Sequence, residues 1–393
     1  MMFIFSKNTR ILSVFMMAFG LTALIYGFLT DSHSAWPSLM FNNFFFMGIA
    51  LFAVFFIALQ YVSEAAWSIV LKRVPETIST YLPIGGVIML LIVIAGTLHW
   101  HHIYHWMDPE LYVEGGEHYD EIIVGKRAYL NIPFFLIRSI VYVIIWTYCG
   151  KKLRQFSLRE NVQGGLTNYK KSITISAWFI VFFAVTSSTA AWDWIMSIDT
   201  HWFSTIFGWY IFSEWACIGF TTILLLTLYL KHNGYLPEVN NSHIHDLGKW
   251  VFAFSLVWTY MWFSQFMLIW YANIPEEVTY YMERWDSYRL LFWISWGINF
   301  AFPLVLLMSR DAKRNYTRLI VIGLLILLGH WINTFLLITP GTLHEHGHIG
   351  FVEIGMGIGF LGLFIFIVLS NLTKVQLSTT NHPFFDESKH LHT

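Results

Sequence analysis

Several ionisable residues of this 393-residue chain lie within or near long apolar runs, where a charge is costly. A charged side chain at the centre of a bilayer costs about 3 kcal/mol or more, so such groups normally face water or the interior of a helix bundle. Groups at several depths are what a proton path through a membrane requires. The residues that form our candidate proton path are Glu64, Arg138, Asp193, Glu214 and His330.

Each of these residues also has a structural interpretation. Arg138 and Glu214, near the middle of the fourth and sixth apolar runs, are candidates for an ion pair that ties these runs together. His330, in the ninth run, is a candidate for a hydrogen-bonded core histidine. For residues near the ends of runs, the alternative is a solvated position at the membrane surface; these are Glu64, Asp193 and Glu353.

The histidines and cysteines argue against a redox group held by this chain. Of the 17 histidines, only His330 lies well inside an apolar run, whereas a buried haem needs facing pairs of histidines. Two cysteines are too few for an iron–sulfur cluster. His101 and His105 have the spacing of one helical turn, which suits a metal ion, but no carboxylate or thiol completes a site. We therefore expect no metal and no cofactor bound by the chain itself.

Ten apolar runs must position these residues, and each is long enough to cross a bilayer as a helix. Helices are the structure that satisfies the backbone in lipid over runs of this length. We expect an all-α polytopic membrane protein with a single integral membrane domain, residues 1–371, and a short tail, residues 372–393. The predicted spans are 11–30, 39–71, 81–98, 130–149, 173–196, 202–230, 247–271, 288–308, 319–338 and 349–370.

The basic residues predict an orientation. Most of the 23 lysines and arginines fall at the N-terminus, in alternate loops and in the C-terminal tail, all on one predicted side. Because cytoplasmic loops carry an excess of Lys and Arg, both termini are expected in the cytoplasm. The opposite side holds only four basic residues, Lys126, Arg127, Arg284 and Arg289, while Arg138 lies inside a span.

Other patterns limit the function or the packing. The net charge is −1 and no basic cluster carries interleaved aromatic residues, which argues against nucleic acid as a partner. Lipids are the expected surroundings. Small residues four apart let a second helix approach closely, so the glycines of the tenth run predict a helix contact; they are Gly355, Gly357, Gly359 and Gly362.

Several strings resemble one family, the smaller of the two NrfD-like membrane subunits of bacterial alternative complex III. The most specific is DWIMSIDTHWFSTIFGWY at residues 193–210. The others are SEAAWSIVLKRVPETISTYLPIGG (63–86), KRAYLNIPFFLIRSIVYVIIW (126–146), IPEEVTYYMER (274–284), MSRDAKRN (308–315) and WINTFLLITPGTLHEH (331–346).

The resemblance implies a respiratory quinol:electron-acceptor oxidoreductase of the bacterial cell inner membrane. It implies two four-helix bundles, spans 2–5 and 6–9, flanked by spans 1 and 10. The implied partners are a larger NrfD-like paralogue, an iron–sulfur subunit and multihaem cytochrome c subunits, with a terminal oxidase as a further candidate. Haem c and iron–sulfur clusters are expected in those partners, and quinol, menaquinol included, is the expected electron donor.

Three functions remain open, and we favour the first. In it, the chain scaffolds the complex and conducts protons. In the second, a quinol site lies near the outer ends of spans 3–5, with His99 or Asp193 as the base that quinol oxidation requires. The third is a secondary transporter, a class whose helices are usually broken at the midplane. Proline gives little support for the third, because by the predicted boundaries Pro83, Pro133 and Pro303 lie near span ends.

Overall fold

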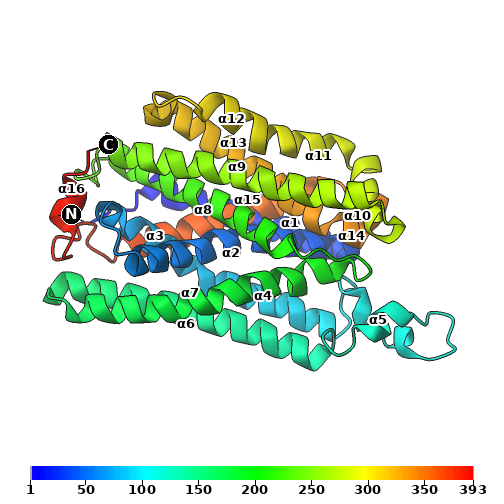
Figure 1. The fold of residues 1–393 in the computed structure, drawn as a ribbon. Helices are drawn as coiled ribbons and strands as arrows, with labels where there is room; N and C mark the ends of the chain where they lie inside the picture. Colours follow the sequence, from blue (N-terminus) through cyan, green and yellow to red (C-terminus); the bar gives the residue numbers. More distant parts are fainter. Residues whose placement is uncertain (1, 393) are drawn as a thin grey trace.

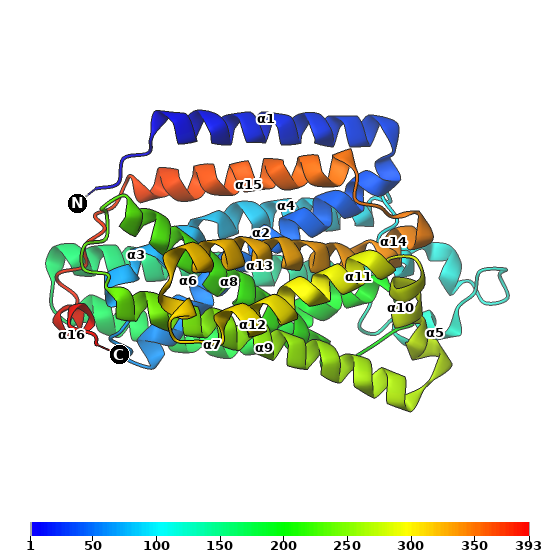
Figure 2. The same cartoon turned by 90° about the horizontal axis from the view of Figure 1, so that it is seen from above.

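The computed structural model describes residues 2–392 as a bundle of long, roughly parallel helices (Figures 1 and 2). Within these residues there is no named strand, and ten helices are long and apolar enough to cross a membrane. The prediction of an all-helical chain with ten candidate spans is therefore confirmed. Both chain ends lie at one end of the bundle, here called the terminal end, and the opposite end is called the distal end.

The candidate spans differ in length and regularity. Six are single helices: α1 (Lys7–Thr30), α2 (Ser32–Val62), α6 (Ile132–Gln163), α8 (Phe207–His232), α9 (Asn241–Ala272) and α15 (Phe351–Leu372). Two begin with a long helix and continue into short helical turns: Thr167–Ile198, with α7 (Thr167–Trp194), and Tyr316–His346, with α13 (Tyr316–Ile338). Two are composite: Ile69–Thr97, with α3 (Arg73–Ile78) and α4 (Leu82–Thr97), and Arg289–Leu307, with α11 (Arg289–Trp296) and α12 (Phe302–Leu307). Short helices are α5 (Glu121–Gly125), α10 (Pro275–Asp286), α14 (Pro340–Leu343) and, in the C-terminal tail, α16 (Phe385–Lys389).

The predicted second span, 39–71, is wrong at its end, because α2 stops at Val62. The stop is a Schellman motif: Glu64 has a left-handed backbone with φ 49°, and the N–H of Ala65 donates to the carbonyl of Gln60. Such a residue is usually glycine, so the sequence carries no stop signal here. Glu64 is consequently an exposed residue of the turn rather than part of the span.

The third span therefore begins earlier than predicted, and it is broken. The stretch Ile69–Thr97 contains α3, a short 3-10 turn and then α4, with Pro83 at the first turn of α4. A proline is tolerated there because the N–H that it lacks has no helical partner. Pro83 thus lies well inside the span, which corrects its predicted position near the end.

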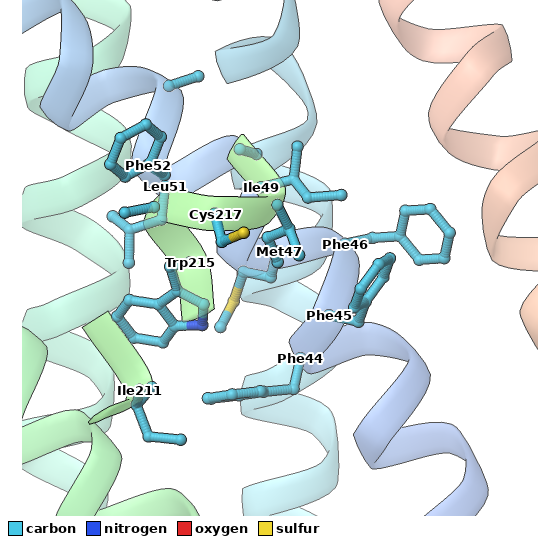
Figure 3. Packing of buried hydrophobic residues seen from close by; sticks show 14 of the residues in the cluster. Phe44, Phe45, Phe46, Met47, Ile49, Leu51, Phe52, Ile211, Trp215 and Cys217 are labelled. Atoms are coloured by element: carbon cyan, nitrogen blue, oxygen red, sulfur yellow. The ribbon is translucent and has the colours of Figure 1, made fainter. Parts of the chain in front are cut away.

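The centre of the bundle is the contact between α2 and α8, the two most buried spans. Glycines on each helix admit a large ring from the other: a Cβ on Gly48 would come 2.3 Å from the Trp215 ring, and one on Gly219 would come 2.1 Å from that of Phe52. Figure 3 shows this region, with Phe44, Met47 and Phe52 of α2 near Trp215 and Cys217 of α8. The two helices form a rigid, closely packed axis.

Helices α1 and α15 form a pair along one side of the bundle (Figure 2). They meet at glycines: a Cβ on Gly359 would lie 2.6 Å from the Cα of Gly20. A Cβ on Gly355 would lie 2.4 Å from that of Ala23. The helix contact predicted from the glycines of the tenth run is confirmed.

Replacing Gly359 by alanine is expected to push α1 away from α15, because the new methyl group meets backbone that cannot rotate aside. Overpacking of this kind typically costs about 1–3 kcal/mol. A lower midpoint of thermal unfolding in detergent would show it. Gly297→Ala is the matched control, since a Cβ there has no neighbour within 4 Å; an equal effect of both variants would contradict the expectation.

Candidate functional site

Glu214 is a carboxylate held near the distal end of the central helix α8, with 1% of its surface exposed. Both of its oxygens accept hydrogen bonds from α13: the Thr334 hydroxyl donates to Oε1 at 2.7 Å, and the Asn333 amide donates to Oε2 at 3.0 Å. No cation pairs with it among the described residues. The buried Glu214 carboxyl group is therefore surrounded by neutral donors. Such surroundings let the carboxyl group hold or release a proton.

A polar route leads from Glu214 toward the distal end. The Tyr210 hydroxyl donates to Oδ1 of Asn333 at 2.8 Å, and both residues line a small cavity of about 20 Å³. A cavity of that size holds about one water. Its other walls include Gln265, Ser295 and Arg284, so the space is polar on several sides.

Arg284 separates this cavity from a second one nearer the distal surface. Its guanidinium donates to the carbonyl oxygens of Tyr280 and Leu336, at 2.7 and 2.9 Å, and its Cζ lies 3.4 Å from the centre of the Tyr280 ring. Arg284 and Tyr280 also line the second cavity, of about 10 Å³, together with Asp199. Asp199 is half-buried. Polar groups thus follow one another from Glu214 to the distal loops.

His330 lies one turn before Thr334 on α13 and is fully buried. Its carbonyl oxygen lies 2.9 Å from the Thr334 hydroxyl, whose single proton is shared between this oxygen and Glu214 Oε1, and this links His330 to the Glu214 group. Neither ring nitrogen has a hydrogen-bond partner among the described residues, and the ring meets the Trp258 indole edge-on at 5.0 Å. The core position expected for His330 is confirmed, but the hydrogen bond to its ring is not found.

Arg138 pairs with Asp193, which corrects the predicted pair with Glu214. Its Nε and Nη2 donate to the two Asp193 oxygens at 2.7 and 2.8 Å, and the Tyr142 hydroxyl donates to Oδ2 at 2.9 Å. Because α6 extends to Gln163, Arg138 lies near the distal end of its helix rather than at its middle. Asp193 is 0% exposed, so the solvated alternative for it is wrong.

The remaining candidates are placed apart from these groups. Glu353 is buried and caps α15, accepting from the Gly350 N–H at 2.9 Å and the Ser38 hydroxyl at 2.7 Å, so the solvated alternative is wrong for it as well. His99 is exposed, with φ 57°, in the turn that ends α4. The structure thus joins Arg138 to Asp193, places His330 beside the Glu214 group, and leaves Glu64 and His99 at the surface.

The helical turn assumed for His101 and His105 does not form. His101 is buried, and both ring nitrogens meet backbone: Nε2 lies 2.9 Å from the Ile92 carbonyl oxygen, and Nδ1 accepts from the Ile103 N–H. His105 is exposed. The two histidines therefore do not share one helix face.

A second buried group, which we call the terminal cluster, lies at the terminal end and was missed in the sequence. Lys72 lies 3.4 Å from Glu160, and Arg73 lies 2.5 Å from Glu76. All four are at least nine-tenths buried. The C-terminal tail covers them: the imidazole of His382 lies 3.5 Å from Glu160. Arg73 and Glu76 have the i,i+3 spacing of an ion pair on a helix. The sequence could have predicted this pair only if the third span had been known to begin at Ile69.

Acidification is expected to loosen this tail. Burial, with the charges of Lys72 and Arg73 adding to it, lowers the pKa of His382 to about 3, despite the nearby Glu160 carboxylate. The undocked imidazole binds a proton near pH 6.5, so between these values the undocked state binds more protons. The free energy that favours docking of the tail is therefore fully present above pH 6.5. Below pH 6.5 it falls by up to about 1.4 kcal/mol per pH unit.

Protease cleavage of the tail, compared at pH 7.5 and 5.5, measures this effect. His382→Leu is expected to abolish the difference between the two pH values. His390→Gln, at an exposed tail histidine, is the control and is expected to preserve it. A wild-type tail that is cut equally at both pH values would refute the expectation.

No protein-family model matches this chain, and a search of curated proteins finds no significant match.

Proposed function

We propose that this chain is an integral membrane subunit of a bacterial quinol:electron-acceptor oxidoreductase, alternative complex III. In this proposal it scaffolds the complex and conducts protons through Glu214, with its termini in the cytoplasm. The observation that carries the proton role is the buried Glu214, bonded only to neutral donors and followed by polar groups up to Asp199. The identity of the complex rests on the resemblance of the quoted strings.

The most specific of those strings, residues 193–210, supplies contacts to several helices. Asp193 binds Arg138, Trp194 donates its indole N–H to the Ser139 hydroxyl at 3.0 Å, and Trp202 stacks on Tyr280 with ring centres 3.9 Å apart. Tyr210 belongs to the Glu214 group. These contacts give the string a structural role in holding several helices together.

Paired features support the proposed arrangement in two bundles. The loop after α7 places His201 2.7 Å from Asp120, and the loop after α13 places His344 2.7 Å from Glu283. In each case the histidine follows the fourth helix of a proposed bundle, and the carboxylate precedes the third. The first helices of the two bundles, α2 and α8, are likewise the two most buried.

The geometry gives less support to a quinol site at the outer ends of spans 3–5. Asp193, proposed there as a base, already accepts hydrogen bonds on both oxygens from Arg138 and Tyr142. His99 lies exposed in a turn. The broken third span favours the transporter alternative, but the cavity beside its first part, lined by Lys72 and Pro75, has a volume of only about 20 Å³, too small for a substrate.

A pull-down of the tagged chain in mild detergent tests the proposal. Mass spectrometry should find multihaem cytochrome and iron–sulfur subunits and the larger NrfD-like paralogue, and the optical spectrum should assign haem to those partners. Reconstitution of that complex in vesicles would then show proton translocation during quinol oxidation. Recovery of the chain alone, without chromophore, would refute membership in the complex and favour the transporter.

A further inference from the structure

An apolar groove of about 820 Å³ runs along the bundle between α15 and the pair α8 and α13. Its lining is almost entirely aliphatic and aromatic, including Leu226 of α8, Leu328 of α13 and Leu361 of α15. Leu328 and Leu361 remain 49% and 40% exposed. Side chains that border an unfilled space lose their dispersion contacts on one side, so hydrocarbon has a favourable place there.

Positive charge gathers where the groove reaches the terminal end. Thr9 of α1 and Leu369 of α15 line that end. Lys7 and Arg10 flank Thr9 on the first turn of α1, and both are exposed. Neither forms an ion pair within residues 2–392. The groove therefore combines an apolar length with unpaired cations at one mouth, which is the pattern of a phospholipid with an anionic head group.

The N-terminal segment crosses this end of the groove. Phe3 is buried, and its ring packs 5.0 Å from that of Tyr235 and 6.5 Å from that of Tyr229. The N–H of Ile4 donates to the Tyr235 hydroxyl at 3.4 Å. The segment thus links α1 to the connection between α8 and α9 (Figure 2). A transmembrane helix of a partner would continue past the terminal end of the groove and would collide with this segment. A lipid has its head group at that end and does not need to pass the segment.

We propose that the groove binds one anionic phospholipid, with its acyl chains against Leu226, Leu328 and Leu361 and its phosphate beside Lys7 and Arg10. The site rests on the membrane position of the chain and is independent of the quinol complex. Lysine and arginine near an anionic lipid surface contribute about 1 kcal/mol each, which is about fivefold in affinity. The two cations together give a preference of about 25-fold for a charged over a zwitterionic head group.

Native mass spectrometry of the purified full-length chain tests the head-group preference, with added phosphatidylglycerol and phosphatidylcholine that carry the same acyl chains. Wild type is expected to retain phosphatidylglycerol at about 25-fold lower concentration than phosphatidylcholine. Lys7→Gln with Arg10→Gln is expected to remove this preference. The matched control, Lys170→Gln with Lys171→Gln, changes two exposed neighbouring lysines at the start of α7 and should preserve it.

Filling the groove tests the position of the acyl chains. Leu328→Trp with Leu361→Trp is expected to release both lipids, whereas Val181→Trp, at a 69% exposed position of α7, should release neither. Equal retention by wild type and the filled variant would overturn the proposal. So would quinone rather than phospholipid in the organic extract, or a photo-crosslinker at position 361 that attaches to a protein chain instead of a lipid.

Discussion

Replacing Arg138 by glutamine is expected to lower the free energy of unfolding by about 3–5 kcal/mol, the largest loss of stability that we predict for this chain. The change leaves Asp193, which is 0% exposed, without the guanidinium that neutralises it, and removing one partner of a buried pair has a cost of this size. It also frees the Tyr129 carbonyl oxygen, to which Arg138 Nη1 donates at 3.1 Å. Unfolding in detergent, followed by intrinsic tryptophan fluorescence, measures the loss.

The double variant Arg138→Gln with Asp193→Asn tests whether the loss of stability comes from the unpaired buried charge of Asp193. With both charges removed, no uncompensated ion remains buried, so most of the stability lost in the single variant should return. Arg159→Gln, at an exposed arginine of the same helix, is the control for loss of charge alone and should change little. If the double variant proves less stable than Arg138→Gln, the pair is not what stabilises this end of the bundle.

The second large effect is expected at Glu214. Glutamine keeps the shape of the side chain and can still accept the Thr334 hydroxyl, but it cannot take up and release a proton. The complex should therefore assemble normally, while proton translocation coupled to quinol oxidation falls at least about a hundredfold, the lower end of what a positioned proton-transfer group supplies. Vesicles with the reconstituted complex and a pH-sensitive dye measure it.

Glu64→Gln is the matched control, because Glu64 is an exposed carboxylate in a turn and its change should leave translocation intact. Tyr210→Phe is a graded test, since it removes the hydroxyl that donates to Asn333 but keeps the ring. It should slow translocation less than Glu214→Gln. Full translocation in Glu214→Gln, with assembly preserved, would remove Glu214 from the mechanism.

The course of the helices could largely be predicted from the sequence, because apolar length alone identifies spans. The end of the second span failed for a local reason: the turn at Glu64 adopts a left-handed backbone without glycine or proline, and apolar residues continue on both sides. That single error moved Lys72 and Arg73 to a loop in the prediction. In the structure they are buried under the C-terminal tail, with Glu76 and Glu160.

Partners across helices were the part that the sequence could not supply. Arg138 and Glu214 were expected to pair because both were placed at mid-depth, whereas α6 extends to Gln163, so that Arg138 lies near its distal end, beside Asp193. Such contacts depend on helix rotation and register, and the composition of a span predicts neither. The same holds for Asn333 and Thr334. Nothing in the sequence distinguishes them from other polar residues, but the rotation of α13 places both side chains against Glu214.

The C-terminal tail completes a part of the molecule that was synthesised long before it. The Ser388 hydroxyl donates to the carbonyl of Trp67 and accepts from the N–H of Val70, and the Thr379 hydroxyl donates to Ile69. During translation about three hundred residues separate the Arg73–Glu76 pair from the tail that covers it, and about two hundred separate the Lys72–Glu160 pair from the same tail. A chain that stops before residue 379 therefore leaves those charges open to water at this end of the bundle.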